Sequence, residues 1–487
     1  MQKYDLIVIG AGSGLDLANA AAQKGLTVAI IEKDRMGGTC LNRGCIPSKL
    51  LIHSADVIQT IKKASLFGIK IEGISIDYQK IVNRVNRITD FDSEEIKKRL
   101  QQSKNPILFT GKCTFIGHKT IAIEKIEEKS SRSSSSRNNS NNNKGNNEQI
   151  ITAEKIVIAA GTRPRIPKIK GLINSGSITS DDALRLQKQP RILTFIGGGY
   201  IACELAHFFG SLGTIINIIE RNDFLIPKED EEISHKFTEI FAKKYNLYLG
   251  FETKLVLSEN RSNNDSNSNG KRFHIIAENK GGRKVKLESD QLLVSVGRIP
   301  NTDLLNLEKT GVKKNEKGFV HVNKYLETTA KGIFALGDIA GRYQFKHNAN
   351  LEAQYAYNNI IYPNRKQSVN YTAMPHAIFS SPQVAGTGYT EQELKKKNIP
   401  YKKSTYPYIS TGMGKALEDK DGFVKFIVDK NNRKILGCHI MGTDASILIH
   451  EVLAAMRIGD GTIDSITKTI HIHPALSEVV IRAAERI

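Results

Sequence analysis

The sequence predicts an α/β protein in which two similar βαβ domains are followed by an α+β domain. Two segments, 4–34 and 191–223, each run from a continuous apolar strand through glycines into a helix and a second strand. From about residue 368 onward, alternating apolar and polar residues replace these continuous runs, which indicates an antiparallel sheet. A chain of 487 residues is also too long for one hydrophobic core, so several domains are expected.

Composition argues against several classes of protein. Hydrophobic residues make up 40% of the chain, and no apolar run approaches the ~20 residues of a membrane span. The amino-terminal residues lack the charged, apolar and small-residue pattern of a secretory signal. Five cysteines in so long a chain do not make a disulfide scaffold, so a reducing, cytoplasmic setting is expected.

The net charge of +20, from 70 basic and 50 acidic residues, raises the question of a nucleic-acid partner. The lysines, however, are scattered over many segments, and no basic helix or arm with interleaved aromatic residues is present. We therefore expect neither nucleic acid nor a membrane as the primary partner. A basic surface suits a soluble enzyme that acts on anionic substrates.

The first βαβ segment has a glycine-rich turn between its strand and its helix. Gly10 and Gly12 fit the pattern GxGxxG, the third position is Leu15, and Gly14 stands beside it. Such a turn lets backbone N–H groups approach a pyrophosphate at the positive end of the helix. Glu32 ends the second strand, 22 residues after Gly10, where an acid accepts hydrogen bonds from ribose hydroxyls.

The second segment repeats this arrangement. Gly197, Gly199 and Ala202 fit GxGxxA, and Glu220 follows 23 residues after the first glycine. Two matches, each with its acid, indicate two dinucleotide sites, whereas one match alone would indicate no more than a tight turn. A carboxylate at Glu220 repels a 2′-phosphate and so favours NAD(H) over NADP(H), although the adjacent Arg221 is able to bind that phosphate.

Each unit leads to a late apolar strand that ends in a glycine, Gly161 in the first and Gly297 in the second. A Ser/Asn-rich tract, 127–149 or 258–272, precedes each late strand. Such tracts bury too little apolar surface to offset the entropy of ordering. Both are expected to be mobile, lengthened hairpin tips without a direct catalytic role.

The terminal segment has the pattern of a separate α+β domain. Residues 371–390 and 422–442 alternate as antiparallel strands do, and helical patterns follow at 445–459 and 474–487.

Cys40 and Cys45 stand five residues apart in a glycine-rich stretch. They could form a structural disulfide, half of a metal site, or a redox pair. A metal site needs further Cys or His residues at ligand spacing, and none lies nearby. In a regular helix residues five apart are ~7.5 Å apart along the axis, too far for a disulfide, so a bridge needs an irregular segment, which Asn42 and Gly44 allow. Pro47 suits the first turn of a following helix, which would place Cys45 near its positive end, where a thiolate is favoured.

Residues 37–49, GGTCLNRGCIPSK, together with the two glycine units, resemble the active-site region of the flavoprotein disulfide reductases, the pyridine nucleotide–disulfide oxidoreductase family. The resemblance covers the whole chain apart from the Ser/Asn-rich tracts. The segment ALGDIAG (335–341) looks like the family's second FAD motif, and HIHPALSE (471–478) looks like its C-terminal base motif.

The resemblance implies a role for each matching residue. Cys45 would be the thiol next to the flavin, Cys40 the thiol that exchanges with substrate, His473 the general base and Glu478 its orienting carboxylate. Lys49 and Glu204 would pair near the flavin ring, where a fixed cation tunes its electronics. The implied FAD contacts are Gly10, Gly12, Gly14, Glu32, Gly38, Thr39, Lys49, Gly161, Asp338 and His347. The implied NAD contacts are Gly197, Gly199, Ala202, Glu204, Glu220 and Gly297, and no metal is implied.

The resemblance also implies a domain order and a dimer. Residues 1–165 would bind FAD, 166–299 would bind NAD, 300–367 would complete the FAD-binding and central region, and 368–487 would form the interface and dimerisation domain. In the family, the base from this last domain reaches the active site of the partner subunit, which implies an obligate homodimer.

Within the family the dihydrolipoyl dehydrogenases resemble the chain most closely, because Ser48 follows Pro47 and the tail has no cysteines. The implied activity is NAD-linked oxidation of a dithiol through a Cys40–Cys45 disulfide, with a role in cell redox homeostasis. The alternative is reduction of a low-molecular-weight disulfide, such as mycothione or glutathione disulfide, by NAD(P)H, since dithiol exchange is reversible. A 2-oxoacid dehydrogenase complex is a candidate partner.

Overall fold

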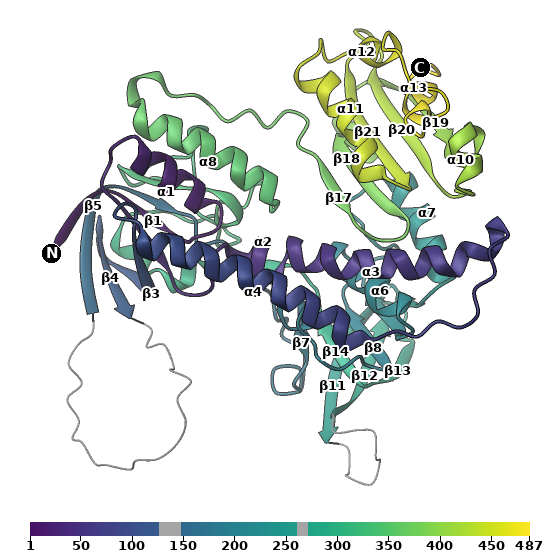
Figure 1. Cartoon of the computed structure of the whole chain (residues 1–487), viewed down its shortest axis with the longest axis horizontal. Helices are drawn as coiled ribbons and strands as arrows, with labels where there is room; N and C mark the ends of the chain where they lie inside the picture. Colours follow the sequence, from purple (N-terminus) through teal and green to yellow (C-terminus); the bar gives the residue numbers. More distant parts are fainter. Residues whose placement is uncertain (126–147, 261–270) are drawn as a thin grey trace. The chain divides into compact units, whose positions relative to one another are not determined.

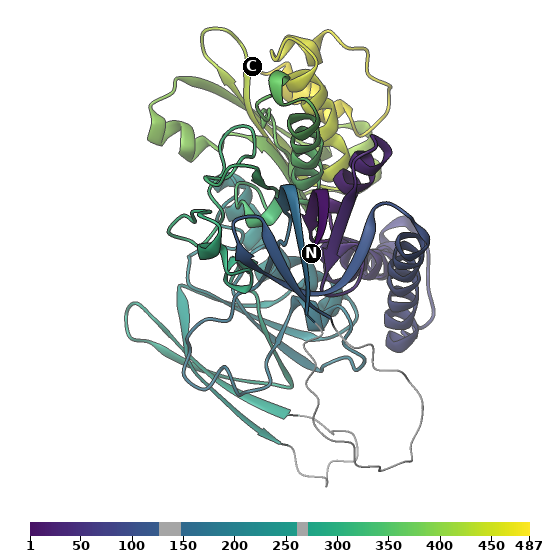
Figure 2. The same ribbon diagram turned by 90° about the vertical axis from the view of Figure 1, so that its left-hand side faces the viewer.

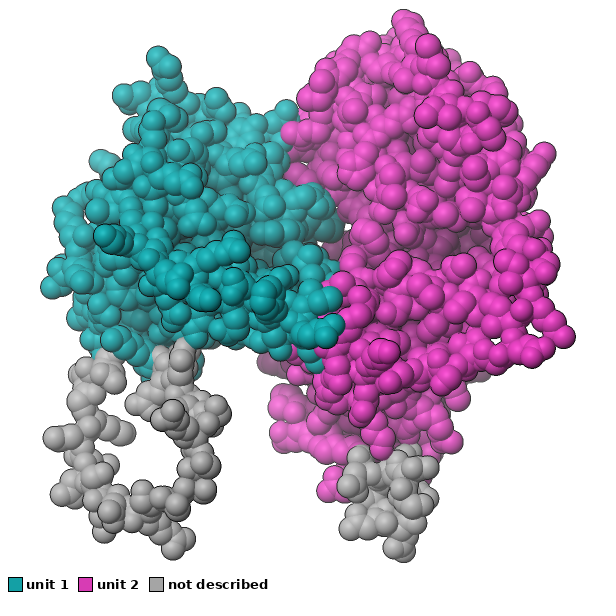
Figure 3. Space-filling view, in the orientation of Figure 1, with its two compact units in different colours: residues 1–47, 86–163, 298–370 teal, residues 48–85, 164–297, 371–487 magenta. Residues whose placement is uncertain are grey.

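The computed structural model describes residues 1–125, 148–260 and 271–487. The expected mobile hairpin tips at 127–149 and 258–272 fall mainly outside the described residues. The two strands on either side of the gap 126–147 pair with each other in antiparallel fashion, and so do the two strands on either side of the gap 261–270. The chain groups into two compact units: unit 1 comprises 1–47, 86–163 and 298–370, and unit 2 comprises 48–85, 164–297 and 371–487 (Figure 3).

Unit 1 is built on a six-stranded sheet in which β1 lies parallel between β2 and β5. Its strands are β1 (Gln2–Ile9), β2 (Val28–Glu32), β3 (Ile107–Gly117), β4 (Thr120–Lys125), β5 (Glu148–Ile158) and β16 (Ile333–Ala335). The helices α1 (Gly14–Gln23) and α8 (Lys346–Ile361) lie side by side and contact each other (Figure 1). Small residues of these two helices pack against apolar residues of the strands and form one buried core with them.

Two long helices contribute to both units. The helix α3 (Cys45–Lys63) begins in unit 1, directly after the short α2 (Gly38–Arg43), and α4 (Tyr78–Gln102) ends in unit 1. The short elements of unit 1 are β6 (Thr162–Pro164), β15 (Arg298–Pro300), η2 (Asn301–Leu304), η3 (Leu307–Lys309), η4 (Gly337–Ile339) and η5 (Pro363–Arg365).

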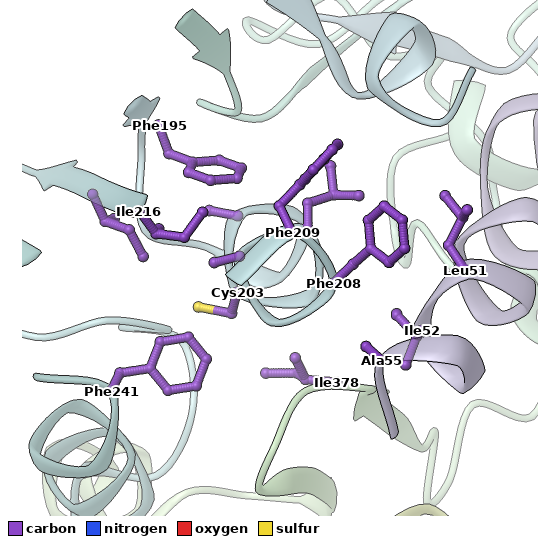
Figure 4. Packing of buried hydrophobic residues seen from close by; sticks show 14 of the residues in the cluster. Leu51, Ile52, Ala55, Phe195, Cys203, Phe208, Phe209, Ile216, Phe241 and Ile378 are labelled. Carbon is purple, nitrogen blue, oxygen red and sulfur yellow. The ribbon is translucent and has the colours of Figure 1, made fainter. Parts of the chain in front are cut away.

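The first part of unit 2 contains a parallel five-stranded sheet. In spatial order its strands are β10 (Asn246–Leu249), β9 (Ile215–Glu220), β8 (Ile192–Ile196), β14 (Gln291–Val294) and β7 (Ile178–Thr179). The helices are η1 (Ala64–Phe67), α5 (Ser180–Ala183), α6 (Tyr200–Ser211) and α7 (Glu231–Ala242). Aromatic side chains of α6, α7 and β8 fill the core together with residues of α3 (Figure 4). Between β10 and β14 in the sequence, the chain forms a separate three-stranded antiparallel sheet (Figures 1 and 2). Its strands are β11 (Phe251–Asn260), β12 (Lys271–Asn279) and β13 (Lys284–Ser289).

The terminal part of unit 2 is a five-stranded antiparallel sheet with helices, which agrees with the alternation in its sequence. In spatial order its strands are β17 (His376–Ile378), β18 (Gln383–Gly388), β21 (Ile435–Gly442), β20 (Phe423–Asp429) and β19 (Tyr401–Pro407). Its helices are α9 (Glu391–Lys397), η6 (Tyr408–Ser410), α10 (Gly412–Ala416), α11 (Ala445–Arg457), α12 (Asp464–Thr467) and α13 (Glu478–Ala484).

The predicted fold class, two Rossmann-like βαβ domains followed by an α+β domain, is confirmed by these sheets. The division of the chain at residues 165, 299 and 367 stays a prediction, because the two compact units are drawn from several segments each. Among the described helices, none is both long and apolar enough to cross a membrane.

Candidate redox and dinucleotide sites

The glycine turn of unit 1 has the geometry that a dinucleotide phosphate requires. Gly10 has a φ of +106°, a backbone angle that residues other than glycine rarely adopt. A Cβ atom there would also lie 2.5 Å from the carbonyl oxygen of Ala159. The next amide, that of Ala11, donates to Glu32 Oε2 at 2.8 Å. Burial raises the pKa of Glu32, although the amide hydrogen bonds it accepts act in the opposite direction.

The third motif position is filled in an unexpected way. A Cβ atom on Gly14 would lie 2.8 Å from Val8 Cγ1 and 3.1 Å from Ala159 Cβ, so Gly14 makes the close helix–strand approach. Leu15, which occupies the GxGxxG position, is partly buried and packs on the core beside it. The small residue of the motif has therefore moved by one position.

The two cysteines flank a break between two helices. Cys40 lies inside α2, Gly44 interrupts the helix with φ −149° and ψ −119°, and Cys45 is the first residue of α3. The irregular segment that a Cys40–Cys45 bridge needs is therefore present, and Cys45 stands at the positive end of a 19-residue helix. Both side chains are thiols, and the pKa of Cys40 is raised, first by its hydrogen bond with Cys45 and then by burial.

The segment with the cysteines packs directly on the glycine turn. The amide of Gly37 donates to the carbonyl oxygen of Ala11 at 3.0 Å. A Cβ atom on Gly38 would lie 2.9 Å from the Cα of Gly12. Cys40 and Cys45 therefore lie in a segment of unit 1 that contacts the first glycine turn, and Thr39 belongs to the same segment as a residue of α2.

Asp338 lies in η4, also in unit 1, and accepts a hydrogen bond from Thr162 Oγ1 at 2.8 Å. Burial raises its pKa, against the opposing effect of that hydrogen bond and of Arg298. Gly161 precedes Thr162 and has a φ of +64°. His347 is exposed in the first turn of α8, where its ring stacks on Phe345 with centroids 5.3 Å apart.

The glycine turn of unit 2 repeats the geometry of unit 1. Gly197 has a φ of +101°, and a Cβ atom there would lie 2.7 Å from the carbonyl oxygen of Ser295. The amide of Gly198 donates to Glu220 Oε2 at 2.6 Å. Gly199 is the N-cap of α6, and Ala202 is fully buried in that helix.

The remaining parts of this turn bear on cofactor preference. Glu220 is 7% exposed and also accepts from the amide of Asn222, whereas Arg221 is exposed. Gly297, after the late strand, has a φ of +102°, and no atom would lie within 4 Å of a Cβ atom there. The acid is thus fixed next to the turn, which is the arrangement expected for an NAD(H) ribose.

Lys49 and Glu204, both in unit 2, form the expected ion pair. Lys49 Nζ lies 2.9 Å and 2.8 Å from the two carboxylate oxygens of Glu204. A third member, Phe379, was not predicted: its amide donates to Glu204 Oε1 at 2.9 Å, and its ring lies 4.4 Å from Lys49 Nζ. The pair is thereby held in place from a distant part of the chain.

His473 and Glu478 also pair as expected. His473 Nδ1 lies 2.9 Å from Glu478 Oε1, and the hydrogen bond lowers the pKa of Glu478. An ionised carboxylate accepts the proton of Nδ1, which leaves Nε2 as the basic nitrogen. His473 is 77% exposed at a cavity of about 440 Å³ that Arg482 and Tyr406 help to line.

The structure separates the two histidines of the HIHP motif. His471 is only 8% exposed, and its Nε2 lies 2.5 Å from Glu451 Oε1 on α11. A ring that is buried and paired in this way is poorly placed to meet a substrate. His473 is therefore the better candidate for the base.

The comparisons with known proteins cover almost the whole chain. Residues 4–353 match the family model "Pyridine nucleotide-disulphide oxidoreductase", and residues 374–484 match its dimerisation domain. The chain belongs to this family. Dihydrolipoyl dehydrogenase of Chlamydia trachomatis is 33% identical over 481 residues, covering 98% of this chain and 95% of the relative. The Bacillus subtilis enzyme of the same name is 31% identical over 492 residues, with 99% and 97% covered.

The solved structures include a similar flavoprotein disulfide reductase. The HOCl-induced enzyme RclA of Escherichia coli, in its Cu(II) complex, superposes with a TM-score of 0.83 at 25% identity, covering 100% of both chains. The expected family, and an enzymatic function, are therefore confirmed.

The cofactors of this family are FAD and NAD(H). The residues of this chain fit both groups. Each unit has a turn in which a Cβ atom at the first glycine would collide with the backbone, and each turn is backed by a buried acid. Among the described residues no group of three or more His, Cys, Asp or Glu side chains could hold a metal ion.

Proposed function

We propose that the chain is a dihydrolipoyl dehydrogenase, which oxidises dihydrolipoamide to lipoamide with NAD⁺ as the electron acceptor. The observation that carries the proposal is the placement of Cys40 and Cys45 on either side of the helix break at Gly44, in a segment that packs against the first glycine turn. Relatives named dihydrolipoyl dehydrogenase at 31–33% identity over nearly the full length support the choice of dithiol.

The cysteines would perform the dithiol exchange. A dihydrolipoamide thiolate attacks the sulfur of Cys40 in the Cys40–Cys45 disulfide and releases Cys45 as a thiolate. The second dihydrolipoamide thiolate attacks the mixed disulfide, which yields lipoamide and leaves Cys40 reduced. Two electrons thus pass from the dithiol to the cysteine pair. Bound FAD would supply the transfer of this electron pair to NAD⁺ as a hydride.

His473 would remove the protons that the exchange releases. Its basic Nε2 accepts a proton from the attacking thiol, and the Glu478 carboxylate stabilises the imidazolium through Nδ1. The match to the dimerisation domain supports a homodimer, in which His473 of each subunit would serve the cysteines of the other.

The remaining predicted residues would hold the cofactors. Gly10, Gly12, Gly14, Glu32, Gly38, Thr39, Lys49, Gly161, Asp338 and His347 are assigned to FAD, and Gly197, Gly199, Ala202, Glu204, Glu220 and Gly297 to NAD(H). We place the enzyme in the cytoplasm, because its cysteines are few and its proposed disulfide is one that must cycle. Membership of a 2-oxoacid dehydrogenase complex is tested by co-purification with an acyltransferase core.

The decisive experiment is a substrate panel on the purified protein. Dihydrolipoamide with NAD⁺ is compared with glutathione disulfide, mycothione and lipoamide, each with NADH and with NADPH. We expect turnover with dihydrolipoamide and NAD⁺, and with lipoamide and NADH in reverse.

The second candidate is an NAD(P)H-dependent reductase of a small disulfide, which the superposition on the disulfide reductase RclA favours. Turnover with one of the non-lipoyl disulfides alone would overturn the dihydrolipoyl assignment and establish this second one. A protein that takes up no flavin would contradict both.

A further inference from the structure

A loop of unit 2, residues 221–230, joins Glu220 to α7 and folds back over the second glycine turn. The amide of Ile226 donates to the carbonyl oxygen of Gly198 at 2.9 Å. A Cβ atom on Gly198 would lie 2.5 Å from Leu225 Cδ2, so the loop fills the space behind the turn. The back of the proposed nucleotide site is therefore formed by this loop.

The loop is held in a strained conformation. Ile226 is fully buried and has a φ of +46°, which a β-branched residue rarely adopts. Such a conformation costs on the order of 1–3 kcal/mol and persists only where surrounding contacts enforce it. Contacts at the end of the loop must therefore compensate for the strain.

Glu229 supplies the first of these contacts. Its carboxylate is fully buried and accepts hydrogen bonds from the hydroxyl of Tyr200 and from His376 Nε2, the latter at 2.7 Å. The rings of Tyr200 and His376 are stacked, with centroids 6.3 Å apart and an interplanar angle of 16°. Tyr200 is the first residue of α6, directly after Gly199. One carboxylate thus ties the loop, the start of α6 and β17 of the terminal domain together.

Asp230 supplies the second contact. It is the N-cap of α7, and its carboxylate accepts from Lys425 Nζ at 2.8 Å and from the amide of Glu391 at 2.9 Å. Lys425 is fully buried in β20. Because Asp230 anchors the loop independently, loss of the Glu229 contacts should not release the whole loop.

We propose that Glu229 is a positioning residue for the nicotinamide dinucleotide, holding Tyr200 and the first turn of α6 where the N–H groups of that turn receive the dinucleotide phosphates. The inference rests on the proposed function, which assigns the turn 197–199 to NAD(H). A turn fixed before binding loses less entropy when the ligand arrives, so the anchor raises affinity. An amide in place of the carboxylate would present an NH₂ group to one of the two donors.

The test compares Glu229→Gln with Glu451→Gln in the flavin-loaded protein. The control removes the same charge from a second Glu–His pair, Glu451–His471, both residues of which belong to the terminal domain. The dissociation constant of NAD⁺ is measured by titration calorimetry, and the reduction of the flavin by dihydrolipoamide is followed without nucleotide. We expect Glu229→Gln to weaken NAD⁺ binding about tenfold, the effect of one lost hydrogen bond to a charged group. Flavin reduction should keep its rate, and Glu451→Gln should keep its NAD⁺ affinity.

A second variant separates positioning from folding. Tyr200→Phe removes the hydroxyl but keeps the ring, and it should weaken NAD⁺ binding in the wild-type background while adding little to Glu229→Gln. Unchanged NAD⁺ affinity in Glu229→Gln would overturn the inference, and so would a parallel loss of flavin, dithiol reduction and NAD⁺ binding, which indicates a purely structural role. A wild-type protein that is reduced by dihydrolipoamide but binds no NAD⁺ would instead refute the assignment of the turn, and this inference with it.

Discussion

The two βαβ segments of this chain can be compared atom by atom. Both begin with a glycine at positive φ, Gly10 at +106° and Gly197 at +101°. In both, the next amide donates to the acid at the end of the second strand, at 2.8 Å for Glu32 and 2.6 Å for Glu220. The backbone of a dinucleotide turn is thus built twice in one chain from different side chains.

The segments differ in where the helix begins. The helix α1 begins four residues after the first glycine, at Gly14, whereas α6 begins three residues after it, at Tyr200. The small residue also differs in position, being Gly14, four residues after the first glycine, in the first unit and the buried Ala202, five residues after it, in the second. A motif written as fixed letters therefore misses an approach that the backbone still achieves.

The loops that follow the two acids differ more. In both units the loop returns an amide to the turn, from Gly37 to Ala11 O at 3.0 Å and from Ile226 to Gly198 O at 2.9 Å. Gly37 takes its positive φ of +91° without strain, whereas Ile226 takes +46° against its preference. The first loop goes on to the cysteines, and the second goes on to the buried acids Glu229 and Asp230.

The anchors of the two loops also differ in kind. The first loop is held at Met36, whose carbonyl oxygen accepts from Ser93 Oγ at 2.9 Å and Asn42 Nδ2 at 2.8 Å. The ion pair that Arg35 of this loop forms with Asp90 is partly exposed. The second is held by the buried charges of Asp230 and Lys425. The buried contacts that hold the first loop are thus neutral hydrogen bonds, whereas those that hold the second loop are ion pairs. This difference can be tested by mutation.

The largest expected effect concerns the cysteines. Cys40→Ser should retain bound yellow flavin but lose dithiol turnover, because a serine oxygen cannot form the mixed disulfide. The matched control is Cys203→Ala on α6 in the second unit, a fully buried cysteine that should be dispensable for turnover. Turnover of dihydrolipoamide and the flavin absorbance are the two measurements. Activity retained in Cys40→Ser would remove Cys40 from the mechanism.

The next effect concerns the ionic anchor of the second unit. Lys425→Met leaves the buried carboxylate of Asp230 without its counter-ion and should destabilise the region by about 3–5 kcal/mol, whereas Glu391 keeps its ion pairs with Lys403 and Lys395. In the first unit Ser93→Ala removes one neutral hydrogen bond and should cost about 1 kcal/mol. Hydrogen exchange in α7 and β20, compared with exchange in β1, measures both. Equal losses would refute the distinction between ionic and neutral anchors.

The sequence predicts what local patterns determine. The two glycine turns, their acids and a helix that starts near Cys45, with Pro47 in its first turn, were all predicted, because each depends on residues within about 25 positions of one another. The Glu229–His376 and Phe379–Glu204 contacts were not, because the residues of each pair lie 147 and 175 positions apart in the chain. One local signal was overlooked: Lys425 lies within the apolar strand FVKFIVD, where an unpaired charge is too costly to bury. The strain at Ile226 has no signature in sequence.

A smaller effect tests the shift of the small residue in α1. Gly14→Ala places a Cβ atom 2.8 Å from Val8 Cγ1 and should cost about 1–3 kcal/mol through overpacking. Asp16→Ala, two residues on at an exposed position, should change stability by less than about 0.5 kcal/mol. Hydrogen exchange in α1 and retention of flavin provide the measurements. A neutral Gly14→Ala would mean that Leu15, not Gly14, sets the helix–strand distance.

The smallest effect is a difference in pH dependence between the two loops. Burial alone would raise the pKa of Glu229 and of Asp230, but His376 and the Tyr200 hydroxyl lower the first, and His439 and Lys425 lower the second. Carboxyl groups with lowered folded-state pKa values contribute stability above their unfolded values, about 4, and this stability is lost as the pH falls through the folded values.

For Glu32 in the first unit the sign is reversed, because its pKa is raised and protonation relieves the cost of its burial. Between pH 7 and pH 5 we therefore expect little change in the second loop, and from pH 5 to pH 3 a progressive loss of stability. The first loop should lose less. Burial alone would raise the pKa of Asp34 but Arg43 lowers it, so that the Asp34 contribution is lost on acidification while the Glu32 contribution changes in the opposite direction. Hydrogen exchange corrected for its intrinsic pH dependence, compared between residues 33–43 and 221–230, measures the difference. If both loops weakened to the same extent on acidification, the buried charges of Glu229 and Asp230 would not be what holds the second loop.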